Sequence, residues 1–313
     1  MGRMDGALIV DKPEGMTSHT VVAHVRRIVG IRRVGHTGTL DPFATGVLVV
    51  LIGKATRLVQ FLSGAEKQYE AVVRFGVTTD TGDITGRELE RSVGAPTLSD
   101  LTAAQIDSAI ASLRGEIEQV PPMYSAKKVK GRRLYELARR GEEIERQPVR
   151  VNIKAFEVAA SDDRSLRLND DGTADLKVNV VCSAGTYIRT LAEDLGKRLG
   201  VGAHLAALRR TRAGAFAIAE AHTLDQLKEM AETNSLQSAM ITPDTAVSHL
   251  AALKLDDDEV RRALNGVAIK VTSEYEQNQR VRLRTLTGDL VGVGTYDSTG
   301  KAVHPQVVLA GNQ

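Results

Sequence analysis

The sequence predicts an α+β protein that ends in a small all-β unit. Apolar residues alternate with polar ones over 69–77 and run unbroken over Val47–Ile52, as in strands with one or two buried faces. In other segments they recur every three or four residues, as in helices. From Val267 onward only short strand-like stretches remain, separated by Gly, Asp and Ser. At 313 residues the chain is long enough for two domains.

The first half of the chain predicts a mixture of strands and helices. Ala7–Val10 is strand-like, and Ser18 is a helix-capping residue type after which apolar residues follow helical spacing through Val29. The run 78–97 is rich in Thr, Asp, Gly and Pro, so we expect a loop there. A helix is predicted over 102–113.

The second half predicts helices first and strands later. A strand is expected over 177–181. The change in sequence pattern toward short strand-like stretches indicates a domain boundary near 245–252. We therefore expect one domain over 1–248 and a second, all-β domain over 249–313. The other predicted elements are helices over 188–199, 223–231 and 256–265 and strands over 267–271, 280–286, 290–296 and 303–309.

Positive charge is unevenly distributed along the chain. The net charge is only +2, but residues 121–150 carry nine Lys or Arg against four Glu, and 1–60 and 186–214 are also basic. Segregation of this kind predicts a basic face that binds a polyanion. The single cysteine, Cys182, excludes an internal disulfide framework. With no apolar run of membrane-spanning length and no signal-peptide core, we expect a cytoplasmic protein.

One carboxylate, Asp41, lies in the glycine-punctuated run Gly35-His36-Thr37-Gly38-Thr39-Leu40-Asp41-Pro42-Phe43-Ala44-Thr45-Gly46. Pro42 disfavours helical geometry at Asp41, and glycine permits close approach of a ligand. Basic residues flank the run: Arg32, Arg33, Lys54 and Arg57. Two interpretations are open at this point. Asp41 is either a catalytic carboxylate that meets a polyanion or part of an Asp-Pro turn joining two core elements.

Two further polar residues stand in informative positions. Tyr69 begins an amphipathic strand, where it is either a core tyrosine or part of a site. Arg189 falls in the first turn of the helix that follows Gly185, although the helix dipole favours cations at the opposite end. An arginine in this position indicates an anionic partner, either an internal carboxylate or a phosphate.

Motifs for common cofactors are missing from the sequence. His36 stands where a P-loop needs lysine, no G-x-G-x-x-G follows a strand, and neither C-x-x-C nor G-x-S-x-G occurs. His19 and His24 fall on different sides of a predicted helix, which does not suit a shared metal ion. We therefore expect no metal site, no nucleotide cofactor and no serine nucleophile.

Several motifs accompany the Asp41 run in a fixed order: Asp11-Lys12-Pro13-Glu14-Gly15-Met16-Thr17-Ser18, Lys67-Gln68-Tyr69-Glu70-Ala71, Pro122-Met123-Tyr124-Ser125-Ala126-Lys127, Gly185-Thr186-Tyr187-Ile188-Arg189, and Gly202-Ala203-His204-Leu205 with Leu208-Arg209-Arg210. Together with the Asp41 run, this series resembles the TruB family of tRNA pseudouridine synthases over residues 6 to about 215. The ordered co-occurrence makes the resemblance specific. The remainder resembles the family only loosely, and its all-β tail is similar to a PUA-type RNA-binding module.

The resemblance implies a mixed or antiparallel sheet with helices packed on it. It also implies an isomerase that converts uridine-55 in the T-loop of tRNA to pseudouridine without a cofactor. Asp41 would then be the essential carboxylate, acting either as a nucleophile at ribose C1′ or as a base at C2′. The sequence leaves both routes open. Arg189 is expected to pair with Asp41 and to lower its pKa.

The remaining implied roles surround the flipped-out base. Tyr69 is expected to stack on the base and to help remove the C5 proton. Tyr187 and Leu208 are expected to line the pocket. His36 is expected near the space that the flipped nucleotide leaves, and Lys12 is expected to support the catalytic loop.

The basic insertion at about 121–150 is expected to grip RNA together with the C-terminal domain. A solvated loop is the alternative for these residues. The implied partner is the T-arm of tRNA, and we expect a monomer with no obligatory protein partner and no membrane attachment. The side chains expected at phosphates are Lys127, Lys128, Lys130, Arg132 and Arg133.

Two other functions remain in competition. An RNA-binding or RNA-folding protein could keep the fold without catalysis, but the joint presence of Asp41, Tyr69 and Arg189 argues against it. A nucleoside hydrolase would also use a carboxylate near C1′. It would act on free nucleosides and would leave the basic segments unexplained.

Overall fold

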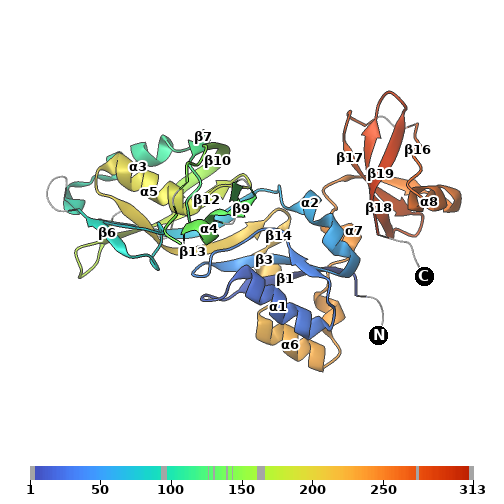
Figure 1. The fold of residues 1–313 in the computed structure, drawn as a ribbon, viewed down its shortest axis with the longest axis horizontal. Coiled ribbons are helices and arrows are strands. Elements are labelled where there is room, and N and C mark those ends of the chain that lie inside the picture. Colours follow the sequence, from blue (N-terminus) through green and yellow to red (C-terminus); the bar gives the residue numbers. More distant parts are fainter. Residues whose placement is uncertain are drawn as a thin grey trace.

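The computed structural model describes residues 4–92, 97–125, 127–129, 131–138, 140–142, 144–160, 166–272 and 275–309. A ten-stranded sheet covered by helices is followed by a five-stranded sheet that begins at Ala251 (Figure 1). The predicted α+β fold with an all-β C-terminal domain is therefore confirmed. Over the described ranges, no helix has the length and apolar character needed to cross a membrane.

The large sheet is mixed, as expected. Its main path runs in the order β1 (Gly6–Lys12), β3 (Thr45–Ile52), β13 (Ala203–Ala213), β4 (Lys67–Phe75), β12 (Ala174–Cys182), β10 (Val149–Val158) and β7 (Gly115–Gln119). Three short strands pair beside this path: β2 (Val34–His36) on β3, β14 (Phe216–Ala217) on β13 and β11 (Arg167–Leu168) on β12. The described pairs are antiparallel except for β3 with β13, so β13 joins the two halves of the sheet.

Helices cover the two halves separately (Figure 1). α1 (Ser18–Val29) and α6 (Leu224–Glu232) share an apolar cluster with β1 and β3. α3 (Ala103–Ala111) and α5 (Ile188–Leu199) share another with β4, β10, β12 and β13. The remaining helices on this sheet are short: η1 (Gly53–Leu58), α2 (Val59–Leu62), η2 (Leu98–Asp100), η3 (Ile218–Glu220), η4 (Leu236–Ala239) and α7 (Pro243–Ala246).

Two local predictions are wrong. Thr17, not Ser18, caps α1, because its side chain accepts from the Thr20 amide at 3.0 Å while Ser18 lies buried inside the helix. The stretch 78–97, expected as a loop, contains strand pairing between β5 (Val77–Thr79) and β6 (Glu88–Arg91). β6 is exposed along its whole length, so its sequence lacks the alternation that predicts a strand. Residues 93–96 lie outside the described residues.

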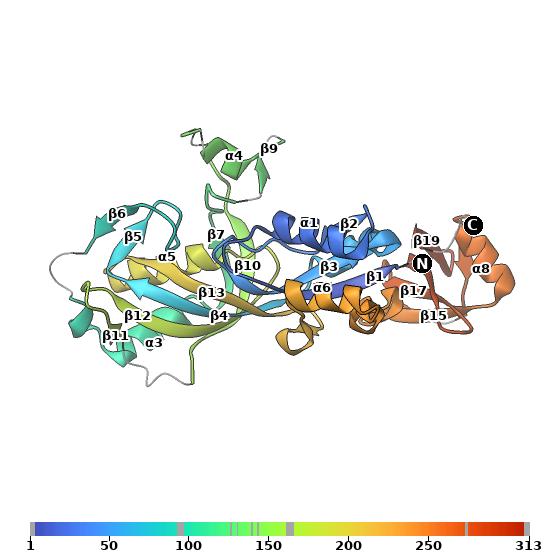
Figure 2. The same ribbon diagram turned by 90° about the horizontal axis from the view of Figure 1, so that it is seen from below.

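The segment between β7 and β10 leaves the sheet as an arm (Figure 2). In it, β8 (Lys128–Val129) pairs with β9 (Arg132–Arg133), and α4 (Leu134–Ala138) follows. Leu134 and Leu137 of α4 are buried. Much of the basic insertion identified in the sequence therefore projects from the sheet (Figure 2).

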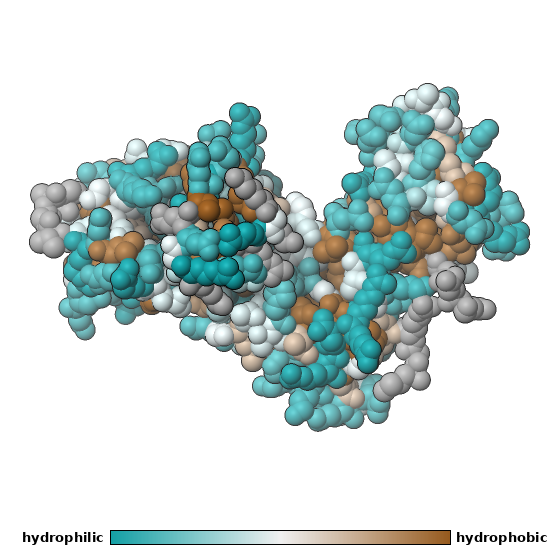
Figure 3. Space-filling model, in the orientation of Figure 1, coloured by the Kyte–Doolittle hydropathy of each residue, from teal (hydrophilic) through white to brown (hydrophobic). Residues whose placement is uncertain are grey.

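The C-terminal domain has its own core and also packs on the large sheet. Its strands lie in the order β15 (Ala251–Leu255), β17 (Arg280–Thr285), β18 (Leu290–Asp297), β19 (Ala302–Val308) and β16 (Ile269–Lys270), with α8 (Asp257–Leu264) packed against them. Val293 and Val307 belong to one apolar cluster with Phe61 and Val247, which come from the α2 and α7 regions. Figure 3 shows a notch between this domain and the arm-bearing part of the molecule.

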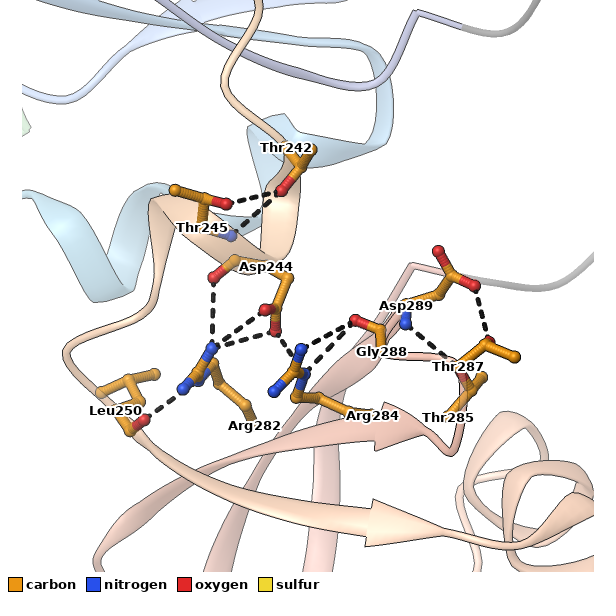
Figure 4. A network of polar contacts seen from close by, with 10 residues as sticks. All are labelled: Thr242, Asp244, Thr245, Leu250, Arg282, Arg284, Thr285, Thr287, Gly288 and Asp289. Atoms are coloured by element: carbon orange, nitrogen blue, oxygen red, sulfur yellow. Dashed lines mark hydrogen bonds and ion pairs between the residues drawn. The ribbon is translucent and has the colours of Figure 1, made fainter.

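A polar clamp reinforces this junction (Figure 4). Asp244 of α7 lies 3.0 Å from Arg282 Nη1 and 3.1 Å from Arg284 Nε, both on β17. Arg282 also donates to the Leu250 carbonyl at 3.0 Å. The side chains of Asp244 and Arg282 are 17% and 12% exposed, so the clamp is largely shielded from solvent.

Candidate active site

Asp41 lies in the loop between β2 and β3, and neighbouring segments fix this loop. Ser18 Oγ donates to the Leu40 carbonyl at 3.0 Å and accepts from the Leu40 amide at 2.8 Å. Gly46 has a φ of +99°, and a Cβ on it would lie 2.2 Å from the Arg210 carbonyl oxygen. Only glycine lets β13 approach β3 this closely. The carboxylate is therefore mounted on a braced loop.

Arg189, near the start of α5, faces Asp41. Its Nε lies 3.0 Å from Asp41 Oδ2, and its Nη1 lies 3.6 Å from Asp83 Oδ2. The guanidinium also donates to the carbonyls of Thr81 and Tyr124, each at 2.6 Å. The expected Asp41–Arg189 pair is present, and the anion indicated by the helix position is an internal carboxylate. With only 5% of its side chain exposed, Arg189 is held in one orientation.

The pKa of Asp41 does not shift in the expected direction. Burial raises the pKa of the Asp41 carboxyl, whereas the Arg189 guanidinium lowers it. Burial is the larger effect, so the net shift is upward, although pairing with Arg189 alone predicts a lowered pKa. Asp83 adds to the rise because it carries a like charge. About a third of the side chain, 34%, is still exposed, and it faces a pocket.

Tyr69 and Leu208 line the same pocket from neighbouring strands. In the register of β4 and β13, Tyr69 lies opposite Arg210, two residues beyond Leu208. Both side chains are more than 90% buried, and the pocket that they line with Asp41 and Arg189 has a volume of about 250 Å³. Burial raises the pKa of the Tyr69 hydroxyl, so it remains protonated at neutral pH.

Tyr187 lines the pocket from the start of α5. Its amide donates to Gln119 Oε1 at 3.0 Å, and its carbonyl accepts from Gln119 Nε2 at 3.2 Å. Gln119 is the buried last residue of β7, directly before the arm. Burial raises the pKa of the Tyr187 hydroxyl, while the positive charge of Arg189 opposes the rise. The base of the arm and the start of α5 therefore meet at the pocket.

Lys12 lies fully buried beside the loop. Its Nζ donates to the carbonyls of Pro13 at 2.8 Å and Pro42 at 3.1 Å. Burial lowers the pKa of Lys12 to about 8, and the charge of Asp41 opposes this shift. Lys12 supports the loop through Pro42, and it is not among the described residues that line the pocket.

This arrangement is suited to chemistry on a buried organic group. A carboxylate can act there as a nucleophile or a base, next to an arginine that orients it and an aromatic ring that can stack on a planar ligand. Over the described part of the chain, no three His, Cys, Asp or Glu side chains gather in a way that could hold a metal ion.

The family follows from comparison with known proteins. Residues 26–188 match the model described as "TruB family pseudouridylate synthase (N terminal domain)". The chain belongs to the TruB family. Residues 189–248 match the "tRNA pseudouridylate synthase B C-terminal domain", and residues 251–309 match "Pseudouridine synthase II TruB, C-terminal". The resemblance found in the sequence is therefore confirmed, and the chain is an RNA-modifying isomerase of the pseudouridylate synthase class.

Similar proteins span nearly the whole chain. "tRNA pseudouridine synthase B" of Thermobifida fusca is 46% identical over 262 residues, which cover 84% of this chain and 85% of the relative. The protein of the same name from Solibacter usitatus is 40% identical over 308 residues, 98% of this chain and 100% of the relative. Among solved structures, a chain from a Cbf5-Nop10-Gar1 complex has a TM-score of 0.72 and 28% identity, covering 97% of this chain and 85% of that one.

His36, another expected site residue, lies outside the pocket of this TruB-family protein. It ends β2, where its ring meets that of His19 edge to face with centroids 5.5 Å apart. Its buried Nδ1 has no hydrogen-bond partner among the described residues. Burial lowers the pKa of His36, and the nearby His19 and Arg210 lower it further. The structure therefore puts His36 near the Asp41 loop but not in the pocket that Asp41, Tyr69 and Arg189 line.

Lys127 and Arg132, two of the basic residues expected at phosphates, lie on the arm and are not among the described residues that line the pocket. Lys127 is half-buried at the base of the arm, and Arg132 forms an ion pair of 3.1 Å with Glu142. Lys128 and Arg133 are cross-strand partners in β8 and β9. Lys130 lies outside the described residues.

Among the described residues, the buried polar residues of the site that were missed as candidates include Lys67, Asp83, Gln119 and Arg210. Lys67 stands on the same face of β4 as Tyr69, two residues earlier, and this buried-face position was a usable signal. Asp83 lies in the turn-rich segment between β5 and β6, where sequence does not reveal that it accepts from the Thr85 amide at 3.0 Å and faces Arg189. Gln119 likewise depends on a partner distant in sequence, Tyr187.

Proposed function

We propose that this chain converts uridine-55 in the T-loop of tRNA to pseudouridine, with Asp41 as the catalytic carboxylate. The observation that carries this proposal is the 3.0 Å ion pair between Asp41 and Arg189 at a pocket that Tyr69 and Leu208 also line. Membership of the TruB family supports the reaction class, and the name shared by the relatives supports tRNA as substrate.

The proposed reaction exchanges one bond between base and ribose for another. The N1–C1′ bond of uridine breaks, the base turns within the pocket and C5 bonds to C1′. C5 then loses its proton and N1 gains one, so the product is an isomer of the substrate and no redox equivalent is needed. Asp41 acts on the sugar, either as a nucleophile at C1′ or as a base at C2′. Each role needs the ionised carboxylate.

The neighbours of Asp41 take roles that follow from their positions. Arg189 orients the carboxylate and offsets part of the cost of ionising it in a buried site. Tyr69 stacks on the uracil ring and assists removal of the C5 proton. Leu208 and Tyr187 form the walls that hold the base in the plane needed for its rotation.

The target uridine must leave its loop to reach this pocket. Flipping a nucleotide out costs a few kcal/mol of stacking and pairing. We propose that His36, next to the catalytic loop on β2, occupies or stacks near the space that the uridine leaves. Lys12 keeps the loop in position during this exchange through its bond to the Pro42 carbonyl.

RNA binding is assigned to the arm and to the C-terminal domain. We propose a catalytic domain over 1–248 and an RNA-binding domain over 249–313, with Lys127, Lys128, Lys130, Arg132 and Arg133 of the arm at phosphates. Such contacts fix the register of the RNA and make its affinity depend on salt. The proposed protein acts as a cytoplasmic monomer with tRNA as its partner and without an obligatory protein partner.

Tritium release tests the proposed function directly. T-arm RNA labelled with tritium at uridine C5 is incubated with the protein, and released label is counted. Release equivalent to one uridine per RNA is expected, together with pseudouridine in a nuclease digest. Tight RNA binding without release would identify an RNA-binding protein, and activity on free uridine would identify a hydrolase.

A further inference from the structure

Two buried cations line the pocket without a carboxylate partner among the described residues. Lys67 is 8% exposed and donates to the carbonyls of Ser63 at 2.7 Å and Ala65 at 2.6 Å. Arg210 is 2% exposed and donates to the carbonyls of Val47 at 2.7 Å and Gly38 at 3.1 Å. All four acceptors are neutral. Buried charges are costly unless they are paired, so this arrangement calls for an anion.

The residues next to these cations do not supply that anion. Cys182 lies opposite Lys67 in the register of β12 and β4, and burial raises the pKa of its thiol to about 11, so the thiol is neutral. Tyr69 is neutral for the same reason. Glu66 turns to Lys154 at 3.3 Å and Arg212 at 3.5 Å.

The two carboxylates of the site, those of Asp41 and Asp83, do not pair with Lys67 or Arg210 either. Asp41 and Asp83 both face Arg189. Burial lowers the pKa of Lys67, and the positive charge of the neighbouring Arg210 lowers it further. The floor of the pocket beside Tyr69 therefore carries excess positive charge before any substrate enters.

We propose that Lys67 and Arg210 form a cationic floor that stabilises the negative charge on the uracil base while it is detached from the ribose. This inference rests on the proposed function. When N1–C1′ breaks, its electron pair stays on N1 and spreads to O2 and O4 of the base. Asp41 meanwhile either bonds to C1′ or takes the C2′ proton, so both routes release the same uracil anion.

The geometry favours stabilisation of this anion over binding of the substrate. The uracil of the bound uridine is neutral, so its attraction to the floor grows only as the bond breaks, which lowers the barrier. A lysine ammonium has three donors, and the two carbonyls take two of those of Lys67, which leaves one for the pocket. Arg210 also braces Gly38 and Val47, so Lys67 is the cleaner residue to test.

The test uses the full-length protein and compares two RNA substrates whose target bases differ in acidity. Single-turnover rates and RNA affinities are measured for wild type, Lys67→Met, Lys67→Arg and the exposed control Lys228→Met, with T-arm RNA carrying uridine or 5-fluorouridine. Lys67→Met is expected to slow conversion of uridine by about 100-fold with affinity within a few-fold of wild type. Lys67→Arg keeps the charge and is expected to recover most of the rate.

The fluorinated base separates electrostatic from structural effects. Fluorine stabilises the detached anion, so Lys67→Met is expected to slow consumption of 5-fluorouridine much less, by about tenfold or under. Equal losses on both bases would overturn the inference and leave Lys67 as a brace for the end of α2. Weaker RNA binding at an unchanged rate would assign the charge to a phosphate and also overturn it. A wild-type protein that converts no uridine would refute the proposed function itself, and the cationic floor with it.

Discussion

Ser18 and Leu40 are joined by two hydrogen bonds, one in each direction between the Ser18 hydroxyl and the Leu40 backbone. Leu40 directly precedes Asp41, so helix α1 sets the position of the loop that carries Asp41. The serine that fits a helix cap by residue type thus serves a different purpose one residue inside the helix. The sequence alone does not show whether such a serine caps the helix or binds a distant loop.

Replacing Ser18 with alanine is expected to loosen this loop. The change leaves the buried amide and carbonyl of Leu40 without partners, which costs about 1–3 kcal/mol of unfolding free energy. The single-turnover rate is expected to fall by about tenfold because Asp41 is less well oriented. Denaturant unfolding and rate measurements check this, with the exposed Ser238→Ala as control. An unchanged rate despite lost stability would show that the brace serves folding only.

Asp41→Asn is expected to abolish isomerisation while RNA affinity stays within a few-fold of wild type. The amide keeps the shape of the side chain but cannot act as a nucleophile or a base at neutral pH. Tritium release and filter binding measure the two properties on the same preparation. Asp11→Asn, which affects the ion pair with Arg209 outside the pocket, is the matched control. Loss of RNA binding or of the folded state in Asp41→Asn would make Asp41 a structural turn residue.

The rate of the chemical step is expected to depend on pH in both directions. Asp41 must be ionised, and burial raises its pKa above the ordinary 3.8, so the rate should fall on acidification at a higher pH than for an exposed aspartate. Lys12 and Lys67 each have a pKa lowered by burial to about 8, so they lose their charge and the rate should fall as pH rises through about 8. Single-turnover rates between about pH 4 and 10 test the expectation, and a rate that does not fall between about pH 7 and 9 would contradict it.

Breaking the clamp at Asp244 is expected to weaken RNA binding more than chemistry. Asp244→Ala leaves Arg282 and Arg284 without their carboxylate partner, at a cost on the order of 2 kcal/mol for this largely shielded site. If the C-terminal domain grips RNA, its looser attachment should raise Kd while the rate at saturating RNA stays near wild type. Asp225→Ala, in α6, is a control with an exposed carboxylate. A lower saturating rate with unchanged Kd would contradict the assignment.

The sequence predicts well those elements whose pattern is local. The stripe of α5 ends at Gly200, and the alternation from Tyr69 to Phe75 marks the buried face of β4, as the structure confirms. β13 was not predicted, because its sequence is an apolar stretch followed by arginines, without a clear strand alternation. Its place in the sheet depends on pairing with both β3 and β4, which are distant in the sequence. β6 was missed because an exposed strand pair has no apolar alternation to reveal it.

The residues of the site likewise fall into those that the local sequence indicates and those that only the tertiary structure reveals. Asp41 and Arg189 were candidates because each is chemically out of place locally, one in a glycine-rich loop and the other at the start of a helix. Asp83, Gln119 and Arg210 became visible only through tertiary contacts, since each is defined by a partner far away in the sequence. The upward pKa shift of Asp41 was missed for the same reason, because burial cannot be read from neighbours in the chain.

The central place of β13 has a consequence for biosynthesis. β3 and β4 do not pair with each other, and β13 is the strand that bonds to both, although it comes more than a hundred residues after them. A growing chain can therefore assemble two separate half-sheets whose facing edges remain open until Ala203–Ala213 has left the ribosome. Leu208 and Arg210 of the pocket belong to β13, so we expect chains that lack this strand to be inactive. We also expect such chains to aggregate unless another protein covers the open edges of β3 and β4.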